Sequence, residues 1–217
     1  MYKRQLDESI WGEIKKSGRS GFLGESVRKL KKEKTNILPN FTKRSRAYLE
    51  IQNGCNHSCT FCIIPQGRGL SKSVPMDTIL EKIRNLVNKG FKEIVLTGVD
   101  ITCWGSDIAG NDKLGDLVNN ILNETPNLPR LRLSSLDVSE MDDNLLHVFK
   151  TNKRMMPHLH LSLQSGNNLI LKRMKRRHSR EQAIDLCRNL KAARPELTFG
   201  ADLIAGFPTE SDTMFLD

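Results

Sequence analysis

The chain has 217 residues, of which 38% are hydrophobic, enough for one well-buried domain. It has no run approaching the ~20 apolar residues that span a bilayer and no apolar core of a signal peptide, which excludes a membrane or secreted protein and predicts a cytoplasmic location. The formal net charge is +9, and the five cysteines, an odd number, favour metal binding in a reducing compartment over a disulfide framework.

Most of the excess positive charge lies near the N-terminus. Residues 1–46 hold 13 Lys and Arg against 5 Asp and Glu, a balance of +8. Residues 1–45 show little periodicity and are expected to be a basic interdomain linker or the remnant of an N-terminal domain. Because Lys and Arg neutralise phosphates, this segment predicts RNA affinity, with a merely solvated linker as the alternative. A second basic cluster is interpreted as either a phosphate contact or a solvated helix surface: Lys172, Arg173, Lys175, Arg176, Arg177 and Arg180.

From residue 46 onward, strand-like and helix-like patterns alternate. The runs expected to be strands are 46–52, 93–97, 130–134, 158–163 and 197–204. Five strands alternating with helices predict an α/β fold built on a parallel sheet. Residues 46–217 are therefore expected to form a single domain.

The helices expected between these strands have recognisable ends. The first has Asp77 as its N-cap and Gly90 as its stop. Another opens with Ser139 and Asp142, which resemble a capping box. A longer helix runs to about Ala193 and precedes the last strand.

Three cysteines lie in the loop that follows the first expected strand. Cys55, Cys59 and Cys62 are spaced by four and three residues. Three thiolates can bind three irons of a [4Fe-4S] cluster and leave the fourth iron open for a cofactor or substrate. A closed zinc site would need a fourth ligand, for which His57 is the local candidate. Thiolates suit both metals, so the spacing alone leaves both interpretations open.

The spacing CxxxCxxC, with Phe61 before the last cysteine, resembles the signature of the radical SAM superfamily. In that family the open iron binds the amino and carboxylate groups of S-adenosylmethionine (SAM), and one electron cleaves SAM to methionine and a 5′-deoxyadenosyl radical. The resemblance implies a partial (β/α) barrel, truncated in this chain, with Phe61 near the adenine. The longer string CTFCIIP (59–65) is similar to one branch of the family, the methylthiotransferases.

Later strings agree with that branch, each near the end of an expected strand. The resemblance implies that the SAM contacts include Gly98, Ser135, Gln164, Ser165 and Gly206. A physical reason also supports Gly98 as a SAM contact, because a residue without Cβ lets the backbone approach a ligand closely. His158 and His160 alternate onto one face of the fourth strand and are interpreted as interior polar residues rather than a metal pair.

The two remaining cysteines are interpreted differently from the first three. Cys187 falls on the apolar face of the long helix with Ala183 and Leu190, which predicts a core thiol. Cys103 follows the second strand close to the expected site. An incidental cysteine is favoured there over a functional one.

The string LRLSSLD (131–137) is most similar to the branch that modifies threonylcarbamoyladenosine in tRNA. The resemblance thus implies a transferase that adds a methylthio group to C2 of this nucleoside beside the anticodon. It also implies tRNA as partner and an electron donor such as a flavodoxin or ferredoxin, and it leaves the sulfur source open. Alternatives within the family are isopentenyladenosine in tRNA or an aspartate of a ribosomal protein. Alternatives outside the family are a non-catalytic zinc or RNA-binding module and an inactive gene fragment.

The resemblance implies that a complete methylthiotransferase has three parts. A second [4Fe-4S] cluster, on three further cysteines, comes before the barrel, and an RNA-binding domain comes after it. No cysteine precedes Cys55. The ligands of the second cluster, which is the sulfur donor site in the family, are therefore absent here. The chain is expected to be a fragment that at best cleaves SAM.

Overall fold

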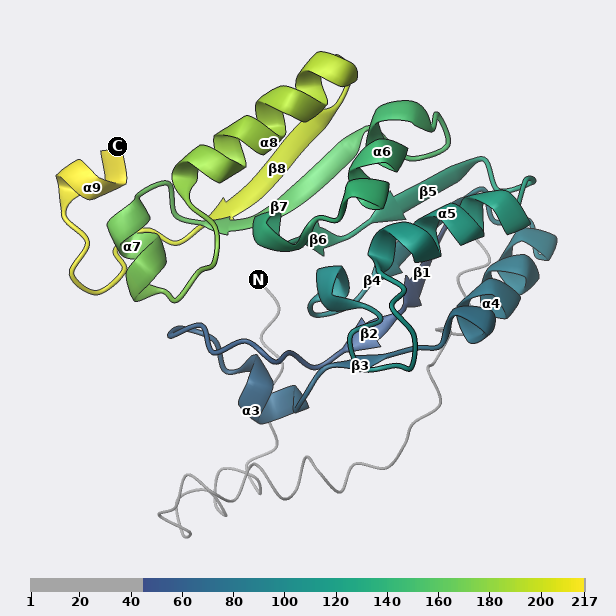
Figure 1. Ribbon diagram of the computed structural model, residues 1–217, viewed down its shortest axis with the longest axis horizontal. Helices are drawn as coiled ribbons and strands as arrows, with labels where there is room; N and C mark the ends of the chain where they lie inside the picture. The colour runs from purple at the N-terminus through teal and green to yellow at the C-terminus, as the bar shows by residue number, and fades with distance from the viewer. Residues whose placement is uncertain (1–44, 217) are drawn as a thin grey trace, which may run out of the picture.

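The computed structural model describes residues 45–216 (Figure 1). Its strands are β1 (Arg46–Glu50), β2 (Gln52–Asn53), β3 (Lys72–Ser73), β4 (Glu93–Thr97), β5 (Arg130–Leu133), β6 (Ser135–Leu136), β7 (His158–Gln164) and β8 (Thr198–Leu203). Its helices are α3 (Ile64–Arg68), α4 (Met76–Asn88), α5 (Leu114–Glu124), α6 (Asp143–Thr151), α7 (Asn168–Arg173), α8 (Arg180–Ala193) and α9 (Asp212–Leu216), with short 3-10 turns η1 (Ile101–Cys103) and η2 (Val138–Glu140). The expected basic linker falls outside the described residues, except for residue 45.

The main strands are parallel and form two three-stranded groups, β1-β4-β5 and β6-β7-β8. Ser134 alone separates β5 from β6, and its N–H donates to the carbonyl of Leu96 on β4 at 3.0 Å. A parallel bridge between Leu131 and Met155 ties the segment before β7 to β5. The strands thus occupy five successive positions in chain order, which confirms the expected α/β partial barrel with five parallel strands.

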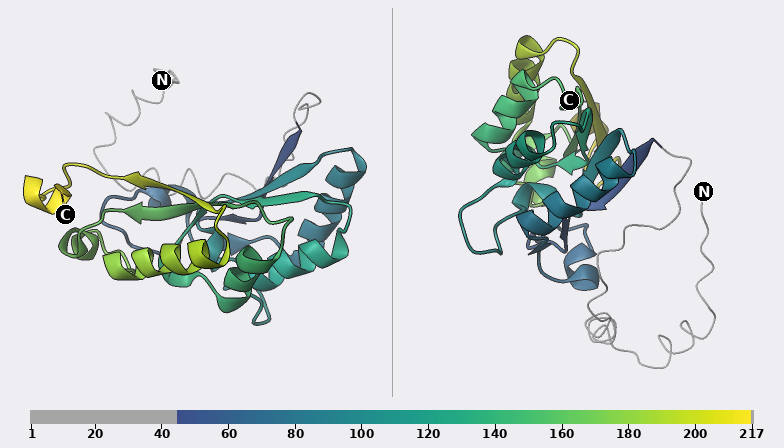
Figure 2. Two further views of the ribbon diagram at one scale, coloured as in Figure 1. Left: turned by 90° about the horizontal axis from the view of Figure 1, so that it is seen from above. Right: turned by 90° about the vertical axis from the view of Figure 1, so that its right-hand side faces the viewer.

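Four helices, α4, α5, α6 and α8, lie along one face of this curved layer of strands (Figure 2, left). The side chains of β1 alternate accordingly, because Ala47 and Leu49 are buried while Arg46 and Tyr48 are exposed. On α5, one side of the helix buries its apolar residues: Leu114, Leu117, Val118, Ile121 and Leu122. The core therefore lies between the strands and these helices, and each fully buried Leu or Ile contributes about 1.5–3 kcal/mol.

The first long helix, α4, differs from the expectation at its start. Pro75 rather than Asp77 occupies the N-cap position, and Asp77 lies in the first turn. A carboxylate there is still favourable, because it faces the positive end of the helix dipole. The stop at Gly90 agrees with the structure, since α4 ends at Asn88 and Gly90 follows with a φ of 90°.

The capping pattern before α6 is also different from the expectation. Ser139 belongs to the turn η2, whose N-cap is Asp137. Asp142 alone caps α6, and its Oδ1 accepts from the N–H of Leu145 at 2.9 Å.

The long helix expected to end near Ala193 is two helices, α7 and α8. Asn167 caps α7, and Ser179 caps α8 in a capping box with Gln182. Within the described range, no helix is both long and apolar enough to cross a membrane.

Candidate functional site

The three clustered cysteines lie in the loop between β2 and α3, beyond the carboxyl ends of the parallel strands. All three are partly buried, and none forms a disulfide. Gly54 begins the loop with a φ of 76°, and a Cβ there would lie 2.1 Å from the carbonyl oxygen of Leu70. The loop can therefore turn back on itself only with glycine at this position. Its closure is fixed by the Cys55 N–H, which donates to the Gly69 carbonyl at 3.1 Å.

The segment that follows α7 holds the far side of the cysteine loop. The Thr60 N–H donates to the carbonyl of Met174 at 3.2 Å, and the Thr60 hydroxyl donates to the carbonyl of Arg173 at 3.0 Å. Two residues later, Arg176 places Nη1 3.7 Å from the Sγ of Cys59. Residues more than 110 positions apart in sequence thus hold the middle of the loop.

Arg176 and Arg177 correct the interpretation of the second basic cluster. The Nη2 of Arg176 lies 2.8 Å from the Oδ2 of Asp137, and both side chains are more than nine-tenths buried. Arg177 also bonds Asp137, at 3.1 Å, and forms an ion pair with Glu140. Arg176 is therefore neither a solvated surface residue nor a free phosphate contact. No local pattern predicts this pairing, because the acids lie in η2 and its N-cap, about 40 residues earlier.

Gln52 fixes the backbone that follows β4. Its Oε1 accepts from the N–H groups of Val99 and Asp100 at 3.1 and 2.8 Å, and its Nε2 donates to the carbonyl of Gly54 at 2.8 Å. A Cβ on Gly98 would lie 2.6 Å from the Gln52 carbonyl oxygen. Gly98 was expected to let the backbone approach a ligand closely. In the structure, the group that it approaches closely is the Gln52 backbone.

The other expected SAM contacts fall into two groups. Gln164 is the last residue of β7, Ser165 follows it, and Gly206 follows β8. Phe61 lies in the cysteine loop and is 40% exposed. These four residues therefore lie at or beyond the carboxyl ends of the strands. Ser135 instead starts β6, and its hydroxyl lies 3.0 Å from the Nδ1 of His160. The structure brings the first four to the same edge as the cysteines but sets Ser135 back within the sheet.

The interpretation of His158 and His160 as interior polar residues agrees with their place on β7. Both side chains are partly buried, and a Cβ on Gly200 of the neighbouring strand would lie 3.1 Å from the His160 ring. Burial lowers the pKa of His158, and the charge of Arg132 lowers it further. Cys187, expected as a core thiol, is partly buried and packs against the core, where burial raises its pKa.

A second constellation lies beside the cysteine loop and was not anticipated from the sequence. His57, Asp100, Cys103 and Glu140 each offer a ligand atom, and all four atoms lie within 4.8 Å of one another. The Nε2 of His57 is 2.8 Å from the Oδ2 of Asp100. The Cys103 thiol donates to the Oε1 of Glu140 at 3.1 Å. His57, weighed above as a zinc ligand beside the three cysteines, belongs to this second group instead.

Two thiols of this region, those of Cys55 and Cys103, have a pKa above that of an ordinary cysteine. Burial raises the pKa of Cys55 to about 11; the His57 N–H opposes the shift, and the Asp100 carboxylate adds to it. Burial raises the pKa of Cys103 as well, helped by its hydrogen bond to Glu140 and by the charge of Asp100. A metal that binds these sulfurs must therefore displace protons.

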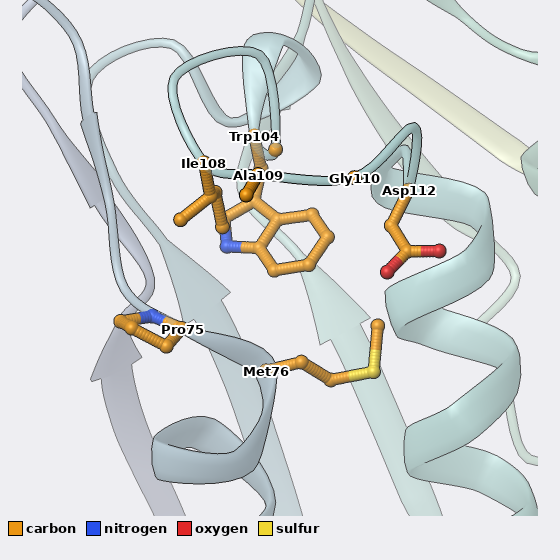
Figure 3. Close-up of a pocket in the computed structure, with 8 residues that line it drawn as sticks. Pro75, Met76, Trp104, Ile108, Ala109, Gly110 and Asp112 are labelled. Atoms are coloured by element: carbon orange, nitrogen blue, oxygen red, sulfur yellow. The ribbon is translucent and has the colours of Figure 1, made fainter.

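Two pockets open in the loop between β4 and α5. The smaller one, about 130 Å³, is mostly apolar and lies between this loop and the start of α4 (Figure 3). Figure 3 shows Trp104 at its centre. The indole N–H of Trp104 donates to the carbonyl of Val74 at 2.9 Å. The larger pocket, about 550 Å³, is lined in part by Cys103 and Glu140 and gives a small ion or ligand a path to them.

Comparison with curated proteins finds close sequence relatives. The chain is 49% identical over 189 residues to the threonylcarbamoyladenosine tRNA methylthiotransferase MtaB of Rickettsia prowazekii, covering 87% of this chain and 45% of the relative. It is 38% identical over 180 residues to the Bacillus subtilis enzyme of the same name, with 83% and 40% covered. It is also 35% identical over 215 residues to the tRNA-2-methylthio-N(6)-dimethylallyladenosine synthase of Shouchella clausii, with 98% and 39% covered. The chain thus spans less than half the length of these relatives.

Comparison with solved structures supports the same fold. The radical SAM methyltransferase TsrM from Kitasatospora setae matches with a TM-score of 0.63 at 16% identity, over 78% of this chain and 32% of that one. The cobalamin-dependent SAM radical enzyme OxsB matches with a TM-score of 0.57 at 16% identity, over 72% and 23%. Residues 49–217 match the radical SAM superfamily. The chain belongs to the radical SAM superfamily, and its sequence resembles the tRNA methylthiotransferases within it.

Proposed function

We propose that this chain is the radical SAM portion of a tRNA methylthiotransferase that acts on C2 of threonylcarbamoyladenosine. One observation carries the proposal: three free thiols spaced CxxxCxxC lie on one loop at the carboxyl edge of the parallel strands. That edge is where sites form in α/β barrels. The 49% identity to a relative of that name supports the choice of reaction.

The cysteine loop fits the cluster that the radical SAM family uses. Its three thiols are partly exposed and unpaired, and Gly54 gives the loop the turn that brings it back over the strands. Three thiolates leave one iron of a cubane open. A cluster held by Cys55, Cys59 and Cys62 would supply, when reduced, the electron needed to cleave SAM. The structure adds no fourth cysteine to the loop in the range that it describes.

The chain's own residues would hold the loop and the cofactor in place. Gln52 fixes the backbone after β4, and Thr60 anchors the loop to the end of α7. We propose that Phe61, Gly98 and the groups at the ends of β7 and β8 contact SAM, as the resemblance implies. Ser135 is the least supported of the expected SAM contacts, because its hydroxyl already lies 3.0 Å from the Nδ1 of His160.

Dimethylallyladenosine is the alternative to threonylcarbamoyladenosine as the modified nucleoside. A relative named for dimethylallyladenosine is 35% identical over nearly the whole chain. The higher identity to the Rickettsia relative and the LRLSSLD string favour threonylcarbamoyladenosine. Methylthiolation assays of the whole protein with tRNAs carrying one or the other nucleoside would separate them. A product only on dimethylallyladenosine would overturn this choice.

We also propose tRNA as the partner, in the cytoplasm, with an external flavodoxin or ferredoxin as electron donor. The +8 balance of residues 1–46 supports RNA affinity that weakens steeply with salt. Deleting residues 1–45 should therefore weaken tRNA binding in gel shifts at low salt. Unchanged affinity would show that this segment is only a linker.

The test of the chemistry is one anaerobic incubation of the reconstituted chain with dithionite, SAM and tRNA. We expect 5′-deoxyadenosine without methylthiolated nucleosides, because the three clustered cysteines of these 217 residues supply ligands for one cluster. Mass spectrometry of the SAM products and of the nucleosides measures both. Absence of 5′-deoxyadenosine from a folded, iron-loaded chain would contradict the proposed radical chemistry. Methylthiolated tRNA would show that the chain carries its own sulfur donor.

A further inference from the structure

We propose that His57, Asp100, Cys103 and Glu140 form a site for one Zn²⁺ ion, separate from the cluster held by the three loop cysteines. The four residues come from three segments: the cysteine loop, the turn after β4 and the end of η2. Imidazole nitrogen, thiolate sulfur and carboxylate oxygen are the ligands that zinc takes in proteins. The proposal does not depend on the reaction that the protein catalyses.

The separations of the ligand atoms suit a tetrahedral ion. Bond lengths of about 2.0–2.3 Å at tetrahedral angles place the ligand atoms about 3.3–3.7 Å apart. Here the His57 Nε2 lies 3.4 Å from the Glu140 Oε1 and 3.6 Å from the Cys103 Sγ. The His57–Asp100 and Cys103–Glu140 contacts are shorter, at 2.8 and 3.1 Å, and the second is a hydrogen bond that the thiol donates. A tetrahedral ion requires these two contacts to lengthen by about 0.5 Å, and all four ligand atoms already lie within 4.8 Å of one another.

Charge also favours a cation. With the thiol ionised, Cys103, Asp100 and Glu140 carry three negative charges, and one Zn²⁺ together with the neighbouring Arg177 balances them. Arg177 bonds Glu140 and so orients a ligand from outside, as the supporting residues of metal sites commonly do. The second carboxylate oxygen of Glu140, Oε2, is buried without a hydrogen-bond partner.

The site would act as a brace rather than a reaction centre. Four protein ligands fill a tetrahedral ion and leave no open position, which is typical of structural zinc. The ion would tie the cysteine loop to the turn after β4, and Asp100 lies 3.5 Å from the Cys55 sulfur on the side of the cluster. The larger pocket beside Cys103 gives the ion its path of entry. The brace would thus fix Cys55 before a cluster is assembled.

The alternative explanation is that metal binds only to the three loop cysteines. A variant that lacks these three cysteines tests it. In the 217-residue chain with Cys55, Cys59 and Cys62 all changed to Ala, we expect about one equivalent of Co²⁺ to bind with the visible absorption of a tetrahedral thiolate site, and Zn²⁺ to displace it. A further Cys103→Ala change should remove the sulfur-to-cobalt band and weaken binding about tenfold or more, and His57→Ala should weaken it similarly. Cys187→Ala is the matched control and should change nothing.

Circular dichroism establishes that each variant is folded. No cobalt spectrum in the folded triple variant, or one that survives Cys103→Ala, would overturn the proposal. If the triple variant does not fold, the wild-type chain with a reconstituted cluster serves instead. Its zinc content should fall on Cys103→Ala while its iron content is unchanged, and zinc that is insensitive to this change would also overturn the proposal. Neither readout depends on SAM cleavage, so the outcome is independent of the proposed reaction.

Discussion

Arg176 and Asp137 form a buried ion pair, with Nη2 and Oδ2 2.8 Å apart, directly behind the cysteine loop. Their side chains are 8% and 5% exposed. The same guanidinium reaches the sulfur of Cys59 at 3.7 Å and the carbonyl of Ser162. One arginine thus links η2, β7 and the loop that carries the cluster cysteines.

Removing one member of this pair should be costly. Arg176→Met leaves the Asp137 carboxylate buried without its main partner, and we expect the free energy of unfolding to fall by about 3–5 kcal/mol. Arg84→Met is the matched control, because Arg84 pairs with Glu124 at 2.9 Å where both are half exposed, and should cost less than about 1 kcal/mol. Urea unfolding measures both. Equal, small losses would contradict a structural role for the Arg176 pair.

Glu93 should make the stability of the domain pH-dependent. Its side chain is 3% exposed among Arg46, Arg130 and Arg132 at the amino end of the strands. Burial alone would raise its pKa, but the hydrogen bond and charge of Arg132, with the other arginines, lower it below 4.5. The stabilisation that ionised Glu93 gives the fold is complete above the ordinary pKa of a glutamate, and it is lost as the pH falls through the lowered pKa.

The test compares the wild-type chain with Glu93→Gln across that acid range. The loss of unfolding free energy below pH 4.5 should be smaller in the variant, because its side chain cannot titrate. Parallel curves for the two proteins would show that Glu93 does not contribute.

Gly98 should tolerate no side chain. Alanine would place Cβ 2.6 Å from the Gln52 carbonyl oxygen and 2.7 Å from the Cγ2 of Ile101. We expect Gly98→Ala to lower the free energy of unfolding by about 1–3 kcal/mol, as overpacking does. Gly166→Ala is the control, because a Cβ there meets nothing within 4 Å. A thermal shift no larger than that of the control would contradict this account of Gly98.

The repeating parts of the fold could be predicted from the sequence because they obey local periodicity. The alternation around Leu49 and the apolar face of α5 identify elements without any knowledge of their neighbours. The spacing of Cys55, Cys59 and Cys62 is equally local. The break between α7 and α8 was missed, although Ser179 and Gln182 form a capping box that could have revealed it.

The remaining site residues could not be predicted in this way. Arg176 meets Asp137 across 39 positions, and His57 meets Cys103 across 46. Such contacts depend on how loops at the ends of different strands converge, and no periodic pattern records that. Gln52 is similar, because its buried amide serves the turn after β4, which is distant in sequence.

The most direct test of the central claim is the iron and sulfide content of the anaerobically reconstituted chain and its cysteine variants. If Cys55, Cys59 and Cys62 bind one [4Fe-4S] cluster, changing any one of them to Ala leaves the loop with two thiolate ligands and should abolish the cluster. Cys187→Ala should leave it intact, because that thiol packs against the core on α8. A Cys59→Ala chain with full wild-type iron and sulfide would contradict the account.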